Sequence, residues 1–375
     1  MNIINSALRR EERAIFELRE LYELLGYKKY KMSKFEEYEL YLENKTFLPS
    51  QRVITFTDNS GKLLALKPDV TLSIAKNVPT SPGEPEKLYY NENVYRTPHG
   101  SNEYKEIMQV GLEYLGELDL YGQCEVLTLA CKSLMKLSEN YVMVVSHLGF
   151  VSGLLEECAL GESQNEKLLE CIGHKNAHEL KRLCGEFGVS KELTSDIAGL
   201  TTLYGSFEDA LGRAGELVRN DTMRDALEQL HDIHRVMSGD SCCGNYKLDF
   251  SVINDLSYYN GLIFQGFISG VPGAILSGGR YDKLMEKLGK NTNAMGFAVY
   301  VDQLEHCGEE DEGFDIDVLL LYDKGAEATK LSAAVKMLTA NGQRVRVQST
   351  KTSRLRYKQL LKLSDGGLEI IEGND

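Results

Sequence analysis

Two strand-like runs joined by a polar loop constrain the fold of this chain more than any other feature. The runs are KLYYNENVYR, which begins at Lys87, and EIMQVGLEYLG, which begins at Glu106; the loop TPHGSNEYK lies between them. Aromatic and aliphatic side chains are frequent in both runs, as is typical of β-strands. The sequence therefore predicts an antiparallel pair of strands with a long connection.

Further elements are expected on both sides of this pair. Apolar residues at helical spacing over 6–26 predict a helix that ends at Gly26. A hairpin turned at Asn59-Ser60-Gly61 joins RVITFTD to KLLALKPD, and a helix follows from Thr71. Residues 119–240 are mostly helical in pattern and contain one plausible strand, YVMVVSHLG.

The second half of the chain returns to strand pattern over 246–269. GAILSGGRYDKLMEKLG then predicts a strand, a glycine turn and a helix, and MGFAVYVDQLEHC predicts a strand leading into a helix. The acidic segment 308–313 is interpreted as a linker. After it, a strand, a helix, a strand, a second helix and a last strand, LEIIEG, predict a small α/β domain over 314–375.

Composition limits the classes of function. The chain has 375 residues and a net charge of −14, which disfavours tRNA as its main partner because phosphate binding relies on Lys and Arg. No apolar run is long enough for a membrane helix, and the charged N-terminus does not resemble a signal peptide, so we expect a cytoplasmic protein. Eight scattered cysteines without a CxxC pair predict free thiols, and we expect no metal or cofactor.

Three short elements carry polar chemistry. Gln109 and Glu113, four residues apart on a strand, point to the same face, where a polar ligand would satisfy them; an exposed sheet face is the alternative. Tyr258 and Tyr259 are read as neighbours on a strand, so only one of them should face a given pocket. Gly278-Gly279 permits either close backbone approach to a ligand or a sharp turn.

In this order and spacing, five segments resemble the motifs of histidyl-tRNA synthetases: LKPDVT (66–71), VYRTPHGSNEYKEIMQVGLEYLG (94–116), SYYNGLIFQGF (257–267), LSGGRYDKL (276–284) and MGFAVYVDQL (295–304). The resemblance implies a dimeric α+β class II synthetase fold, with a mixed, mainly antiparallel sheet flanked by helices. The core would span 1–307, with a mostly helical insertion around 119–240. Residues 314–375 resemble a shortened anticodon-binding domain.

The resemblance also implies a histidine-binding pocket. Asp69 and Thr71 would meet the α-amino group of the amino acid, Gln109 would hold its backbone, and Glu113 would accept a hydrogen bond from the imidazole. The tyrosines would flank the ring. The implied set is Asp69, Thr71, Arg96, Gln109, Glu113, Tyr258 and Tyr259. Carboxylates suit a ligand that carries an ammonium group and a ring N–H.

The ATP-binding part of the synthetase pattern is broken. Asn254 and Gln303 stand where synthetases have arginines that contact ATP, and Glu103 reverses a charge in the loop before the second long strand. Losing fixed positive charges at a phosphoryl centre removes transition-state stabilisation. A motif 1 proline is also replaced, by Ser33. The sequence therefore predicts histidine binding without adenylation and no catalytic residue.

The family that combines these features is the regulatory subunit of ATP phosphoribosyltransferase. Membership would imply L-histidine feedback in the first step of histidine biosynthesis, self-dimerisation, and a hetero-octamer with the short catalytic subunit, which this chain would activate. The alternatives are a working histidyl-tRNA synthetase and a synthetase-like paralogue, such as a tRNA-sensing regulator. The basic stretch Arg344–Lys362 favours the paralogue, unless it is a solvated face or meets an acidic partner.

Overall fold

The protein is described by a computed structural model that covers residues 8–44, 47, 53–81, 83–97, 103–240, 244–253, 258–306, 314–323, 325–351, 355–364 and 367–373. The chain divides into two compact units. One is Arg9–Cys307, and the other contains Gly308–Asp375.

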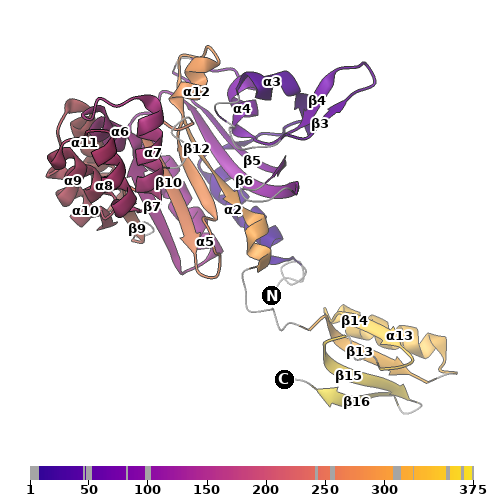
Figure 1. The fold of residues 1–375 in the computed structure, drawn as a ribbon. Coiled ribbons are helices and arrows are strands. Elements are labelled where there is room, and N and C mark those ends of the chain that lie inside the picture. The colour runs from indigo at the N-terminus through magenta and orange to yellow at the C-terminus, as the bar shows by residue number, and fades with distance from the viewer. Residues whose placement is uncertain are drawn as a thin grey trace. The chain divides into compact units, whose positions relative to one another are not determined.

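A nine-stranded sheet forms the centre of the larger unit (Figure 1). Its order is β1-β5-β6-β12-β11-β10-β7-β9-β8. Only the β1–β5 and β7–β9 pairs are parallel, so the prediction of a mixed, mainly antiparallel sheet is confirmed. The strands are β1 (Lys28–Lys29), β5 (Glu86–Arg96), β6 (Lys105–Gly116), β7 (Tyr141–His147), β8 (Tyr204–Ser206), β9 (Tyr246–Asp249), β10 (Leu262–Ile268), β11 (Leu276–Arg280) and β12 (Asn293–Tyr300).

Alternation along β6 assigns the two faces of this sheet. Val110 and Leu112 point into a core shared with α2 (Arg10–Leu24) and α5 (Leu120–Leu137), which cover one face. The alternate residues of the strand, Gln109, Gly111 and Glu113, therefore point to the opposite face. This confirms that Gln109 and Glu113 share a face.

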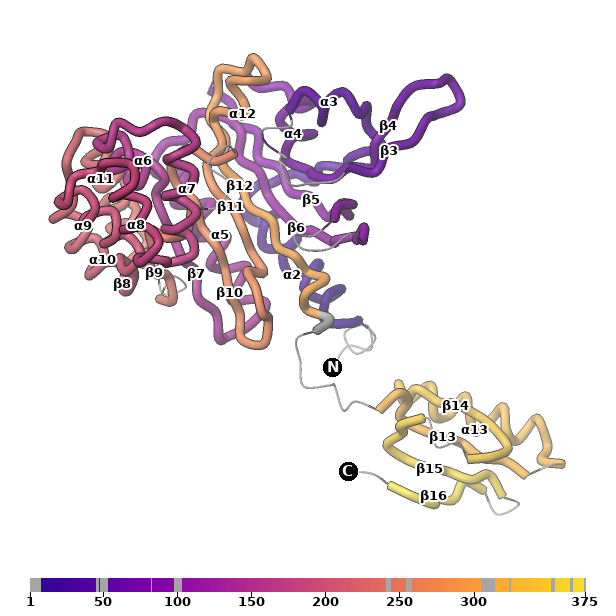
Figure 2. Tube along the Cα trace, in the orientation of Figure 1, coloured from indigo at the N-terminus to yellow at the C-terminus, as the bar shows by residue number. Residues whose placement is uncertain are grey.

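Helices α6 to α11 gather beside β7 and β9, and we call them the helical unit (Figure 2). Their amphipathic pattern buries one side of each helix in the same core as the sheet. Side chains at the N-caps of several helices accept hydrogen bonds from the first turn, for example Asn220 from the Met223 N–H at 3.0 Å. The helices are α6 (Leu148–Glu156), α7 (Glu162–Gly173), α8 (Ala177–Glu186), α9 (Lys191–Leu200), α10 (Phe207–Gly215) and α11 (Asp221–Met237).

A small three-stranded sheet, in the order β2-β4-β3, projects from the larger unit (Figure 1). The predicted hairpin is confirmed, since β3 (Thr55–Thr57) pairs antiparallel with β4 (Leu63–Leu66) and Gly61 has a φ of 84°. β2 (Phe35–Glu37) completes this sheet, and α3 (Tyr38–Glu43) and α4 (Thr71–Asn77) follow β2 and β4. α12 (Asp282–Lys287) and the 3₁₀ helix η3 (Val301–His306) follow β11 and β12.

The smaller unit contains β13 (Ile316–Tyr322), α13 (Ala328–Ala340), β14 (Val345–Gln348), β15 (Tyr357–Ser364) and β16 (Gly367–Gly373). The expectation of a second helix before the last strand is wrong, because the described residues there form β15. Leu361 packs into the core beneath α13, whereas Leu360 packs with Leu319 in a second cluster. In a strand, successive side chains point to opposite faces of the sheet, so these two neighbouring leucines can be buried in different clusters.

The basic stretch of this unit is largely neutralised by its own acidic residues. Arg344 and Lys358 form ion pairs with Asp317, and the pKa of Asp317 falls to about 2 despite its desolvation because these groups donate hydrogen bonds to it. The remaining pairs are Lys351–Glu372, Arg356–Asp315 and Lys362–Asp323. These contacts favour the interpretation of the stretch as a solvated face. None of the described helices is both long and apolar enough to span a membrane.

Candidate ligand-binding site

Small residues occupy the middle of the sheet face that Gln109 and Glu113 share. Glu113 of β6 lies opposite Gly296 of β12, which in turn lies opposite Gly279 of β11. In the next row Gly111 lies opposite Ala298, which is paired with a serine of β11. Polar side chains from the rim can therefore lie close to the backbone.

Side chains from neighbouring positions pack directly over these glycines. A Cβ atom at Gly296 would lie 1.8 Å from Oε2 of Glu113, and one at Gly279 would lie 2.6 Å from the ring of Tyr259. A Cβ atom at Gly111 would lie 2.4 Å from the Tyr90 ring. Real side chains do not approach so closely, so glycine is required at these positions for the carboxylate and the rings to rest on the sheet.

Glu113 is the most deeply buried acidic side chain of this face, with an exposed fraction of 1%. Its carboxylate accepts hydrogen bonds from Thr71 Oγ1 at 2.6 Å and from the Tyr281 hydroxyl at 2.5 Å. Burial raises the pKa of Glu113 to about 8, although both hydrogen bonds act in the opposite direction, and the nearby Asp69 charge raises it further. Without a ligand, Glu113 is therefore largely protonated at neutral pH.

Asp69 brings a second carboxyl to the same place. Its Oδ1 accepts a hydrogen bond of 2.7 Å from the Leu72 N–H, at the start of α4. Burial raises the pKa of Asp69, and the Leu72 N–H and the positive charge of Arg96 oppose that shift. Arg96 lies at the end of β5, with its guanidinium 5.9 Å from the centre of the Tyr300 ring. Gln109, only 4% exposed, is the residue opposite Tyr300 on the neighbouring strand.

The prediction that Tyr258 and Tyr259 are neighbours on a strand is wrong. Tyr258 and Tyr259 lie outside any strand, after β9 and before β10, so the rule that neighbours face opposite sides does not apply. Their ring centres are only 4.7 Å apart in an edge-to-face contact. Tyr258 also packs 5.7 Å from Tyr281. Both tyrosines therefore contribute to one aromatic wall beside Glu113.

The structure brings the seven predicted site residues to one sheet face and its rim. Thr71 contacts Glu113 directly. Burial raises the pKa of Tyr258, and this tyrosine lies close enough to Asp69 and Glu113 for their charges to raise it further. Two participants were missed in the sequence, Tyr281 and Tyr90. Tyr281 belongs to the motif LSGGRYDKL and Tyr90 shares the face of Glu113, so both could have been found from strand alternation and motif membership.

Of the positions where the synthetase pattern is broken, Asn254 lies outside the described residues. Gln303 belongs to η3, directly after β12, and Glu103 precedes β6. Ser33 lies just before β2. Gln303 and Glu103 thus flank strands that carry the site, and Ser33 lies beside the three-stranded sheet.

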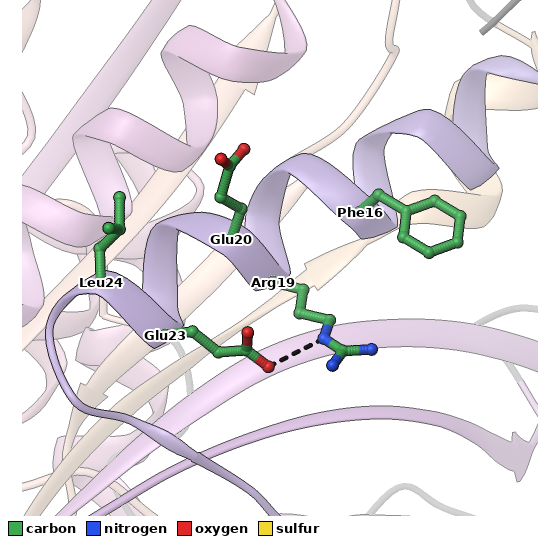
Figure 3. Close-up of a pocket in the computed structure, with 5 residues that line it drawn as sticks. All are labelled: Phe16, Arg19, Glu20, Glu23 and Leu24. Carbon is green, nitrogen blue, oxygen red and sulfur yellow. Dashed lines mark hydrogen bonds and ion pairs between the residues drawn. The ribbon is translucent and has the colours of Figure 1, made fainter. Parts of the chain in front are cut away.

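A different kind of surface lies along α2. A shallow pocket of about 440 Å³ is lined by Phe16, Arg19, Glu20, Glu23 and Leu24, and an ion pair joins Arg19 to Glu23 (Figure 3). Phe16 is 57% exposed and Leu24 is 78% exposed. Small-molecule sites bury a few convergent polar groups, whereas this surface exposes apolar side chains, which favours a protein contact.

Comparison with known proteins is consistent with this geometry. Residues 2–304 match the family model described as histidyl-tRNA synthetase. An ATP phosphoribosyltransferase regulatory subunit of Clostridium kluyveri is 33% identical over 321 residues, which is 82% of this chain and 81% of the relative. Another from Clostridium acetobutylicum is 29% identical, with 95% of this chain and 92% of the relative covered.

Solved structures show the same fold. A protein from Bacillus halodurans described as an ATP phosphoribosyltransferase regulatory subunit/histidyl-tRNA synthetase has a TM-score of 0.75 at 24% identity, covering 94% of this chain and 93% of that one. A chain of the ATP phosphoribosyl transferase complex of Thermotoga maritima has a TM-score of 0.60 at 18% identity, covering 76% of this chain and 96% of that one. The predicted class II synthetase-like fold is confirmed.

Proposed function

The chain belongs to the family of ATP phosphoribosyltransferase regulatory subunits, which shares the histidyl-tRNA synthetase domain, and on that premise we propose that it binds L-histidine and thereby controls the short catalytic subunit. The observation that carries the proposal is a pair of desolvated carboxyls, the buried Glu113 and the half-buried Asp69, beside an aromatic wall. Among the described residues, neither carboxyl forms an ion pair with a basic side chain. A ligand that brings positive charge and N–H donors would supply what they lack.

L-Histidine matches this arrangement group by group. Its ammonium group suits Asp69, and its ring N–H suits Glu113, the more deeply buried carboxyl. Its ring would pack against Tyr258 and Tyr259. Gln109 and Arg96 lie on the same sheet face and would bind its carboxylate. Thr71 would exchange its bond with Glu113 for one with the ligand.

We propose that the site binds histidine without activating it. Gln303 and Glu103 offer no fixed positive charge where a triphosphate would need one. Histidine-dependent ATP–pyrophosphate exchange separates this proposal from the alternative of a working synthetase, which would show robust exchange. A tRNA-sensing paralogue is disfavoured by the ion pairs that neutralise the basic stretch of the smaller unit.

In this proposal the chain activates the catalytic subunit in a hetero-octamer and transmits inhibition. The histidine site and the chemistry lie on different polypeptides, so histidine acts only through different affinities for two states of the assembly. The test is turnover of the short catalytic subunit with and without this chain during a histidine titration. We expect activation by the chain and inhibition by histidine; a chain that neither co-purifies with the subunit nor changes its turnover would contradict the proposal.

Histidine affinity is expected to rise with pH between about 6.5 and 8. In the free chain the pKa of Glu113 is about 8, so its side chain carries a proton below that pH. The histidine-bound form needs an ionised Glu113 carboxylate that accepts a hydrogen bond from the ring N–H. Binding therefore releases the proton. Calorimetry at pH 7 in buffers of different ionisation enthalpy should show release of about one proton for each histidine bound. An affinity that does not change over this range would place the imidazole away from Glu113.

We also propose that the chain forms a dimer through the three-stranded sheet and α2. The inner face of that sheet carries Glu36, whose carboxylate accepts a hydrogen bond from Tyr41. Its outer face carries Phe35 and Phe56 together with Glu37, which forms an ion pair with Lys62. Phe35 and Phe56 meet edge to face at 5.1 Å and remain 48% and 37% exposed. An apolar face turned outward indicates a protein partner, and the dimeric class II fold makes a second copy the expected one.

Phe35→Ser combined with Phe56→Ser should convert the dimer to a monomer. Each buried aromatic anchor typically contributes about 2 kcal/mol, so each loss weakens dimerisation by about thirtyfold. Light scattering after size exclusion measures the mass, and Val236→Ser, which removes a similarly exposed side chain from α11, is the control. A double variant that remains dimeric at low micromolar concentration would rule out this interface.

A further inference from the structure

The first turn of α4 is hydrogen-bonded to two different sheets. Thr71 Oγ1 donates to Oε1 of Glu113, on β6 of the central sheet, at 2.6 Å. Two residues later, the Ser73 hydroxyl donates to Oε1 of Glu36, on β2 of the three-stranded sheet. Side chains two positions apart on a helix point about 200° away from each other, so a single turn of α4 can reach both sheets.

Glu36 is held in place by its own sheet as well as by α4. It is half-buried and lies opposite Ala65 of β4, and its Oε2 accepts a 3.0 Å hydrogen bond from the Tyr41 hydroxyl of α3. The carboxylate therefore joins β2, α3 and α4. Ser73 is fully buried, and its Oγ accepts a hydrogen bond of 3.2 Å from Asn77, which leaves the hydroxyl proton for Glu36. Water does not compete for a hydrogen bond in such a place.

The same segment of the chain carries Asp69, whose carboxyl lies within reach of the Glu36 charge. Burial raises the pKa of Asp69, and the negative charge of Glu36 raises it further, while the Leu72 N–H and Arg96 act in the opposite direction. Two carboxyls near each other favour a cationic group beside them. Glu36 thus acts on the turn that would bind the ligand in two ways, through its charge and through its bond with Ser73.

We infer that Glu36 positions the first turn of α4 for ligand binding, and that the three-stranded sheet therefore responds to occupancy of the site. This inference rests on the proposed function for the identity of the ligand, L-histidine. When Thr71 exchanges its bond with Glu113 for one with the ligand, the bond from Ser73 keeps the turn attached to the three-stranded sheet. Glu36 is a positioning residue, because it acts on the ligand-binding side chains through α4. Coupling is reciprocal, so a ligand held by this turn must also stabilise the attachment of the sheet.

Ser73→Ala tests the attachment, because it removes the hydrogen bond to Glu36 and alters no predicted ligand contact. We expect it to weaken histidine binding about fivefold, which corresponds to one ordinary hydrogen bond. Glu36→Ala removes the same bond from the other side, together with the charge. Ser73→Ala should therefore have no further effect on histidine affinity in a chain that already carries Glu36→Ala.

Ser133→Ala is the matched control. Ser133 is equally buried, and its hydroxyl is hydrogen-bonded to Tyr22 on the other side of the central sheet, so this variant should bind histidine as wild type does. Hydrogen exchange of the peptide 55–66, which contains β3 and β4, measures the attachment of the three-stranded sheet without histidine. In the ligand-free full chain we expect faster exchange in Ser73→Ala and unchanged exchange in Ser133→Ala.

Saturating histidine should slow exchange of the same peptide in the wild-type chain, and do so much less in Ser73→Ala. Wild-type exchange in ligand-free Ser73→Ala would overturn the inference, as would a fivefold loss of affinity that persists in full on the Glu36→Ala background. Failure of the wild-type chain to bind histidine would instead refute the proposed function. The ligand-free exchange rates would still decide whether the bond between Ser73 and Glu36 holds the sheet.

Discussion

Glu113→Gln is expected to weaken histidine binding by about ten- to a hundredfold, because it removes a charge-assisted hydrogen bond typically worth about 1.5–3 kcal/mol. The same substitution should raise stability at pH 8. The pKa of Glu113 is about 8 in the folded chain and 4.5 when unperturbed, so the folded state holds an extra proton between these values. Stability contributed by this group therefore falls as pH rises from about 4.5 to 8, and glutamine removes that loss.

Glu125→Gln is the matched control for this pair of effects. Glu125 is also buried, but it forms an ion pair with Lys87 on the other side of the sheet, away from the site. Its neutralisation should lower Tm and leave histidine affinity unchanged. Calorimetric titration and thermal unfolding at pH 8 measure the two quantities. A Glu113→Gln variant that binds histidine like wild type would mean that Glu113 does not face the ligand.

Gly296→Ala is expected to abolish detectable histidine binding and to lower the free energy of unfolding by about 1–3 kcal/mol. The added Cβ would lie 1.8 Å from Oε2 of Glu113 and 2.4 Å from the carbonyl oxygen of Leu112. The carboxylate can move away, at the cost of its place in the site, but the Leu112 carbonyl belongs to the neighbouring strand and cannot move alone. The pairing of β6 and β12 must therefore distort.

Gly212→Ala provides the corresponding control. Gly212 lies in α10, where an added Cβ meets nothing within 4 Å, so alanine should leave binding unchanged and raise helix stability by up to about 1 kcal/mol. The two variants add the same methyl group in opposite surroundings. Wild-type histidine affinity in Gly296→Ala would contradict the close packing of Glu113 over the sheet.

Much of the fold was predictable because its elements carry strong local patterns. The long strand pair, the hairpin turned at Gly61 and the helices between 119 and 240 all follow from periodicity and turn residues. Likewise, period-two spacing was enough to place Gln109 and Glu113 on one face. What could be predicted of the site came from strand alternation together with the order and spacing of its motifs.

The failures share a physical cause, which is that tertiary contacts override local pattern. Lys358–Lys362 resembles a helix in composition, but burial of Leu360 and Leu361 in different clusters makes it a strand. Tyr258 and Tyr259 look like strand residues, yet contacts with Tyr281 and Gly279 place both rings together. The hydrogen bond from Ser73 to Glu36 joins residues 37 positions apart, and no local signal in the sequence indicates it.

In the function proposed for this chain, a synthetase-like site serves to sense histidine. The sharpest test is a calorimetric titration of L-histidine into the isolated chain in the absence of ATP. We expect saturable binding of one histidine per chain with proton release at pH 7. Absence of binding heat in several buffers, in a chain that still activates the catalytic subunit, would contradict it and leave an activator without a sensor.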